Sequence, residues 1–187
     1  MAVLVGDKLF IYAFETAAKA FALTDRADLV GKAISILANK AGIYGMIGGQ
    51  SVDVEYTDRP VTKSQLEFIY ELKTAALLEA AMMIGAVLAG ADDNQVKAAE
   101  QIAHHVGMAF QIRDDILDVI STTEELGKPV KSDEKNNKTT YVTIYGLDGA
   151  SKLVEEYSHT AMTLLDQVCP NASFLKRLFE YLIVRKK

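Results

Sequence analysis

The segment Phe110-Gln111-Ile112-Arg113-Asp114-Asp115-Ile116-Leu117-Asp118-Val119 sets three carboxylates in a largely apolar run. On an α-helix, which turns about 100° per residue, Gln111, Asp114, Asp115 and Asp118 fall within one stripe about 100° wide. Most of the remaining positions are isoleucine, leucine or valine. The sequence therefore predicts a helix that packs on most of its sides and carries an acidic stripe on one.

The rest of the chain follows a helical pattern as well. Alanine, leucine, glutamate, lysine and methionine dominate the segments between the three prolines, and period-two alternation is nearly absent. Thr62 followed by Gln65 is a capping-box pattern, and Asp92-Asp93 is typical of a helix start rather than a metal site. We expect six helices, the fifth broken at 146–149, over residues 2–20, 27–54, 62–88, 92–121, 141–168 and 173–187. The predicted fold is all-α, a single domain (1–187) built as a bundle of long helices.

Glycines are informative in the second and the fourth of these expected helices. Four of them cluster in the second expected helix, at Gly42, Gly45, Gly48 and Gly49. Glycine weakens a helix, so the cluster indicates a bend or a close helix contact; room for a ligand against bare backbone is the alternative. The spacing does not match GxGxxG, so we predict no nucleotide site. Gly107, one turn before Gln111, is expected to leave space above the acidic stripe.

Composition excludes several classes of protein. Half of the 187 residues are hydrophobic, enough for a core, and 25 acidic residues against 20 basic ones argue against a nucleic-acid partner. The single cysteine, Cys169, rules out an internal disulfide and a CxxC zinc site. The most apolar window, 74–91, contains Glu79 and is too rich in small residues for a membrane span. Asp7 and Lys8 interrupt the first apolar run, so we expect no secretion signal and a cytoplasmic location.

The acidic stripe has two interpretations. Three close carboxylates repel one another and burial adds to the cost of their charge, so such a cluster needs a counter-charge. Hard oxygen ligands suit Mg²⁺, which keeps several waters and bridges to substrate phosphate. The alternative is a solvated helix face, but the neighbours are apolar and no lysine follows any of the three by four residues. His104 and His105 lack a zinc-site spacing and are interpreted as paired or surface side chains.

Other polar residues accompany the stripe. Segment 126–140 contains four lysines and ends at a helix start, as a phosphate-binding lid would require; a plain solvated loop is the alternative. Lys73-Thr74 lies inside an apolar helix, and Gln50 and Asp53, three residues apart, share a helix face. For both pairs, an ordinary surface position is the alternative.

Taken together, these motifs resemble those of the trans-isoprenyl diphosphate synthases, which include the farnesyl and geranylgeranyl diphosphate synthases. The run from Gly107 to Asp118 is similar to that family's second aspartate-rich motif, and segments 127–129 and 133–141 match the residues that follow it. Gly6-Asp7, Gly49-Gln50-x-x-Asp53 and Lys73-Thr74 agree as well, so the resemblance covers essentially the whole chain. It implies an all-α terpenoid-synthase fold, usually a homodimer.

The resemblance also implies the chemistry, which is Mg²⁺-dependent head-to-tail condensation of isopentenyl diphosphate with an allylic diphosphate. It implies Asp114 as a direct Mg²⁺ ligand, with Asp115 and Asp118 supporting the metal through water. The contacts that it implies to the allylic diphosphate are Lys73, Thr74, Gln111, Lys128 and Lys138. It further implies that Gln50 and Asp53 line the pocket near the reacting carbon and that Asp133 orients metal-bound water. The catalytic residues that we expect are Lys73, Thr74, Gln111 and Asp114.

One departure from the family's pattern is large. The first aspartate-rich motif and the basic residues that hold isopentenyl diphosphate would precede Ala2, and the sequence contains neither. We therefore expect the chain to match the C-terminal two thirds of a synthase, to be impaired on its own, and to self-associate through exposed apolar faces. The alternative to an enzyme is a non-catalytic truncated or partner subunit.

Overall fold

The fold is known from a computed structural model that describes residues 1–121 and 138–185, and helices are its only regular elements there. The first elements are α1 (Ala2–Ala18), the 3₁₀ turn η1 (Lys19–Ala22), α2 (Ala27–Ala41) and α3 (Met46–Glu55). They are followed by α4 (Lys63–Tyr70), the π-helical segment η2 (Glu71–Ala75) and α5 (Ala76–Leu88). The last are α6 (Asp93–Ile120), α9 (Tyr141–Val168) and α10 (Ser173–Val184). The all-α prediction is confirmed.

Local sequence signals set several helix ends. The Thr62 hydroxyl accepts a bond from the Gln65 backbone N–H at 3.3 Å, and the Gln65 side chain accepts the Thr62 N–H at 2.8 Å. Asp92 and Gln95 form the same reciprocal pair at the start of α6. Gly146 has a positive φ of 69°, which breaks the helical geometry inside α9 where a break was expected. These ends were predicted because capping and positive φ are properties of short sequences.

The expected single helix over 27–54 is wrong. The chain leaves α2 after Ala41 and re-enters a helix at Met46. A Cβ on Gly45 would lie 1.9 Å from the Lys40 carbonyl oxygen, so only glycine fits this bend. Of the two interpretations of the glycine cluster, the bend and close packing are what the structure contains. The helix expected over 62–88 is continuous, but it includes the π-helical segment η2, which was not predicted.

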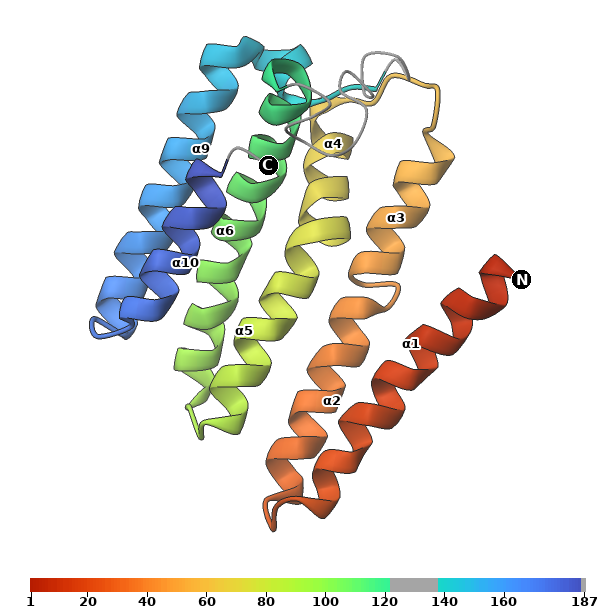
Figure 1. Cartoon of the computed structure of the whole chain (residues 1–187), viewed down its shortest axis with the longest axis vertical. Coiled ribbons are helices and arrows are strands. Elements are labelled where there is room, and N and C mark those ends of the chain that lie inside the picture. Colours follow the sequence, from red (N-terminus) through yellow and green to blue (C-terminus); the bar gives the residue numbers. More distant parts are fainter. Residues whose placement is uncertain (122–137, 186–187) are drawn as a thin grey trace.

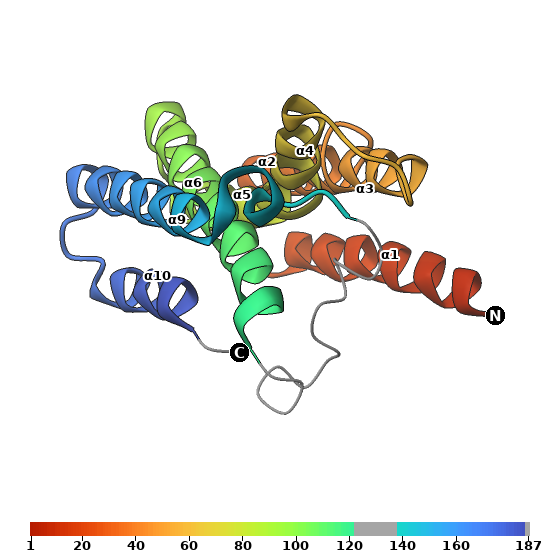
Figure 2. The same ribbon diagram turned by 90° about the horizontal axis from the view of Figure 1, so that it is seen from above.

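The long helices lie side by side along the length of the molecule (Figure 1). α6 packs most extensively against α9 and also against α5, and α5 packs against α2. Seen from above, α10 and α1 lie on the same side of these helices (Figure 2). One core cluster, which includes Leu66, Ile69 and Ile112, joins α4 to α6 and α9; another, which includes Ile102, Leu165 and Phe179, joins α6 to α9 and α10.

α1 has no buried residue, and several of its large apolar side chains are exposed, Val3, Leu4, Leu9 and Ile11 among them. Within the described ranges, no helix combines the length and hydropathy that crossing a bilayer requires.

Candidate functional site

Two glycines bring three elements of the site into close contact. A Cβ on Gly49 of α3 would lie 2.4 Å from the Lys73 backbone nitrogen, and one on Gly107 of α6 would lie 2.6 Å from the Ala75 Cβ. Both α3 and α6 therefore pack directly on η2. The expectation that Gly107 leaves space above the acidic stripe is wrong, because Ala75 fills that space.

The residue four positions after each glycine meets a polar side chain of η2. Residues four apart share a helix face. Asp53 therefore lies on the same face as Gly49 and contacts Lys73, and Gln111 lies on the same face as Gly107 and contacts Thr74. Lys73 Nζ lies 2.5 Å from Asp53 Oδ2, and Thr74 Oγ1 donates to Gln111 Oε1 at 2.8 Å. π-helical turns occur frequently at functional sites. Here the turn holds consecutive side chains that bond two different helices.

Asp53 gathers two lysines. Lys138 precedes α9, and its Nζ lies 3.1 Å from Asp53 Oδ1. Lys73 contacts the other oxygen of the same carboxylate, Oδ2. Although burial by itself acts in the other direction, the hydrogen bonds and charges of Lys73 and Lys138 hold the pKa of Asp53 below its ordinary value. The structure thus brings together two of the lysines that the resemblance assigned to a diphosphate, around one ionised carboxylate.

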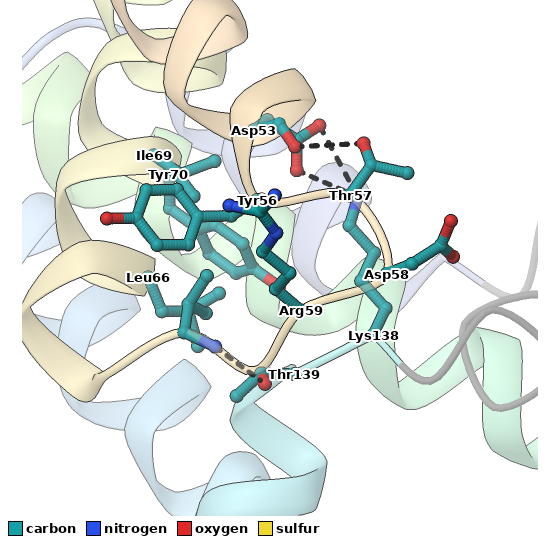
Figure 3. Close-up of a pocket in the computed structure, with 11 residues that line it drawn as sticks. Asp53, Tyr56, Thr57, Asp58, Arg59, Leu66, Ile69, Tyr70, Lys138 and Thr139 are labelled. Atoms are coloured by element: carbon teal, nitrogen blue, oxygen red, sulfur yellow. Dashed lines mark hydrogen bonds and ion pairs between the residues drawn. The ribbon is translucent and has the colours of Figure 1, made fainter.

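Two pockets flank this ion-pair cluster. One, of about 350 Å³, is lined by Asp53, Lys138, Arg59 and Tyr70 among others, and in it Asp53 and Lys138 point toward one another (Figure 3). The other, of about 560 Å³, lies on the α3 side and contains both Gln50 and Lys73. Its further lining residues are Met46, Ile47, Ser51 and Val54. Gln50 itself is exposed, so it meets the site at the rim of this second pocket.

The three aspartates of α6 meet different neighbours. Asp115 is buried and accepts the Tyr70 hydroxyl at 2.8 and 2.7 Å and the Tyr141 backbone N–H at 3.0 Å. Asp114 is 28% exposed, and its Oδ1 lies 2.5 Å from Arg185 Nη2. Asp118 is buried at 5% exposure. Because Asp115 accepts the first backbone N–H of α9, its negative charge also stabilises the N-terminus of that helix. Asp115 therefore links α6 to both α4 and α9.

The donor set fits a divalent cation that is shared with a phosphate. Among the residues described by the structure, no group of three or more histidine, cysteine, aspartate and glutamate side chains is arranged to hold a metal. Mg²⁺ does not require such a cage, because it is commonly bound by one or two carboxylates together with water and substrate phosphate. Asp114, partly exposed and already paired with one cation, has the chemistry of such a ligand.

Some expected site residues lie elsewhere, and others were missed. Lys128 and Asp133 fall outside the described residues. His104 is paired, as interpreted, with Nδ1 3.1 Å from Glu79 Oε1, whereas His105 Nδ1 is buried with no partner in the described part of the chain. Sequence reasoning missed Tyr70 and Arg185. Neither belongs to a motif used above, and only their contacts with Asp115 and Asp114 reveal them.

The molecule is thus an all-α bundle that presents lysines and carboxylates beside open pockets. Residues 1–171 match the model of the polyprenyl synthetase family, and the chain belongs to that family. A farnesyl diphosphate synthase from Geobacillus stearothermophilus is 36% identical over 185 residues, which are 99% of this chain and 62% of that enzyme. A geranylgeranyl diphosphate synthase from Cyanophora paradoxa is 41% identical over 83% of this chain and 52% of its own length.

Solved structures agree with this assignment. A Helicobacter pylori geranyltransferase, solved with magnesium and isoprenyl diphosphate, is 33% identical and superposes with a TM-score of 0.82 over 97% of this chain and 59% of its own. A geranylgeranyl pyrophosphate synthetase from Pyrococcus horikoshii is 26% identical with a TM-score of 0.84 over 99% of this chain and 67% of its own. The fold is thus the all-α terpenoid-synthase fold. The chain spans less than two thirds of the length of both curated relatives described above.

Proposed function

We propose that the chain carries the allylic diphosphate half of a trans-isoprenyl diphosphate synthase active site and acts in Mg²⁺-dependent condensation with isopentenyl diphosphate. The observation that carries the proposal is the cluster of Lys73 and Lys138 around Asp53, next to the Thr74–Gln111 bond. Two ammonium groups held within reach of one point are suited to a ligand with several negative oxygens. Family membership supports the same chemistry.

In this proposal the lysines act on the leaving group. Ionisation of an allylic diphosphate breaks the bond between C1 and the bridging oxygen, and the electron pair leaves with diphosphate. Lys73 and Lys138 stabilise the charge that grows there, which is where electrostatic catalysis contributes most. Thr74 and Gln111 orient the same group by hydrogen bonds. A Mg²⁺ held by Asp114, supported by Asp115 and Asp118 through water, would supply further positive charge to the diphosphate oxygens.

The second half of the reaction needs exclusion of water. The pocket beside Lys73 that contains Gln50 is lined in part by the apolar side chains of Met46, Ile47 and Val54, which suit a prenyl chain and its cation. The double bond of isopentenyl diphosphate attacks C1, and the resulting cation loses a proton to the departing diphosphate.

Calorimetric titration of the chain with diphosphate in the presence of Mg²⁺ tests the binding part. We expect measurable heat for the parent, at least about tenfold weaker binding for Asp114→Ala, and no change for Asp148→Ala, which removes an exposed carboxylate on α9. An absence of heat, or equal affinity of parent and Asp114→Ala, contradicts the proposal.

Turnover separates the enzyme from a second candidate, a non-catalytic partner subunit. The observation that favours the second candidate is that the 187 residues contain a single DDxxD run, at 114–118. The assay combines the chain with farnesyl diphosphate and radiolabelled isopentenyl diphosphate. Efficient formation of a longer product supports the enzyme, and diphosphate binding without transfer supports the partner subunit. We expect transfer by the isolated chain to be weak.

A further inference from the structure

Arg185 at the end of α10 is held by one face of α6. Its Nη2 lies 2.5 Å from Asp114 Oδ1, and its guanidinium carbon lies 3.8 Å from the centre of the Phe110 ring. Its backbone carbonyl accepts bonds from Arg113 Nη2 at 3.1 Å and Nε at 3.4 Å. Three residues of a single turn of α6 thus fix both the backbone and the side chain of Arg185.

These contacts place a positive charge where the proposed function needs a metal ion. The side chain of Arg185 is only 14% exposed and that of Asp114 28%, so solvent screens the pair less than an ordinary surface ion pair. A divalent cation on Oδ1 would meet the guanidinium at close range, and like charges at that distance repel strongly in a partly buried site. Asp114 therefore cannot hold both cations on Oδ1 in this arrangement.

The guanidinium is incompletely satisfied in this position. Its Nε is buried and donates to no acceptor among the described residues. An unmade hydrogen bond of a buried donor costs free energy, so the contact is weaker than a fully bonded arginine–carboxylate pair. Such a pair can be displaced by a ligand of higher charge.

We propose that Arg185 is a built-in counter-cation for Asp114, which occupies the carboxylate in the absence of metal and is displaced when a divalent cation binds. The inference rests on the proposed function in one respect only, namely that Asp114 is a metal ligand. Because Arg185 competes for the carboxylate, a higher metal concentration is needed before the metal binds Asp114. When no metal is bound, Arg185 neutralises the charge of Asp114. The Phe110 ring is the platform that keeps the guanidinium over Asp114.

Binding of Mn²⁺ to the chain, followed by electron paramagnetic resonance of the free ion, tests this inference without any activity assay. Removing the competing charge in Arg185→Gln should tighten Mn²⁺ binding about fivefold or more. Arg177→Gln is the matched control, because it removes the same charge from an exposed position of the same helix, and it should bind like the parent. Phe110→Leu, which keeps every charge but removes the ring, should tighten binding about twofold.

Asp114→Asn, alone and combined with Arg185→Gln, separates the two proposals. If Asp114→Asn loses Mn²⁺ binding both alone and combined with Arg185→Gln, Asp114 is the ligand. In that case, Mn²⁺ binding by Arg185→Gln that is equal to or weaker than that of the parent overturns the counter-cation role. Mn²⁺ binding that survives Asp114→Asn overturns the metal role of Asp114 itself. Binding by Arg185→Gln but not by the parent supports the inference in its strongest form. Binding by neither overturns the inference, while the proposed function is judged by the calorimetric titration with diphosphate. Mn²⁺ should also raise the midpoint of thermal unfolding more for Arg185→Gln than for the parent. The unfolding transitions also show that the variant and the parent are folded.

Discussion

The hydroxyl of Tyr70 donates to both carboxylate oxygens of Asp115, at 2.8 and 2.7 Å, across 45 residues of sequence. Both side chains are buried, Tyr70 at 6% and Asp115 at 3% exposure. The same carboxylate accepts the first backbone N–H of α9 from Tyr141. One charged group therefore links α4, α6 and α9 directly behind the candidate site.

Tyr70→Phe should destabilise the chain, because it removes a donor to a buried charge while keeping the ring. Bonds to charged groups contribute about 1.5 to 3 kcal/mol, so the free energy of unfolding in urea should fall by about that amount. Tyr44→Phe removes a hydroxyl from a side chain that is 73% exposed and should leave stability unchanged. Equal stability of the two variants would show that the Tyr70–Asp115 bond contributes little.

Gly107→Ala should push η2 and α6 apart. Its Cβ would lie 2.6 Å from that of Ala75, and overpacking of this kind costs about 1 to 3 kcal/mol. Gly85, inside α5, has no atom within 4 Å of an added Cβ, so Gly85→Ala should instead stabilise the helix by about 0.5 to 1 kcal/mol. Denaturant midpoints measure both. A loss of stability in Gly85→Ala, or none in Gly107→Ala, would contradict the packing argument.

Asp53→Asn should leave Lys73 and Lys138 without their shared counter-charge. We expect a loss of about 1 to 2 kcal/mol in the free energy of unfolding, at the low end for charged bonds because the lysines are partly exposed. Because the pKa of Asp53 is lowered in the folded chain, the difference from the parent should be complete above pH 3.8 and narrow as the pH falls through the lowered pKa.

The control for Asp53→Asn is Asp58→Asn. Asp58 is exposed and has a positive φ of 60°, which asparagine also tolerates, so its substitution should change stability by less than about 0.5 kcal/mol. A similar loss in both variants would mean that the ion pairs of Asp53 are not the cause.

His104 should make stability depend on pH. Its hydrogen bond to Glu79, opposed by burial, raises the pKa of His104; Lys40 and Glu100 lie in the same network, and the charge of Glu71 acts in the same direction as Glu79. A raised histidine pKa stabilises the folded chain fully below the ordinary value of 6.5, and this contribution disappears as the pH rises through the raised pKa.

The measurement is urea unfolding between about pH 6 and pH 9, where Glu79 stays ionised because its pKa is lowered. The difference in stability between the parent and His104→Gln should shrink as the pH rises. Burial and the charge of His104 both lower the pKa of His105, so the comparison is repeated with His105→Gln in both chains, which removes this second titration from the difference. His159→Gln, which changes an exposed histidine outside this network, is the control variant. If the difference in free energy of unfolding between the parent and His104→Gln does not change with pH, the His104–Glu79 bond does not couple stability to pH.

The sequence by itself determined most of the helices and most of their ends. Thr62 and Asp92 cap because their hydroxyl and carboxylate bond to N–H groups three residues away, and Gly146 breaks α9 by its own φ. The pairs Gly49–Asp53 and Gly107–Gln111 are also visible as four-residue spacings. Such features depend on neighbours within one turn, which a sequence displays directly.

Only the tertiary structure decided which partner each polar side chain takes. A helical wheel sets Asp114 and Asp115 on one stripe, yet adjacent residues differ by about 100°, so they meet different helices. Asp114 pairs with Arg185, 71 residues away, and Asp115 with Tyr70, 45 residues away. These contacts depend on how separate helices pack, and no short stretch of sequence encodes that packing.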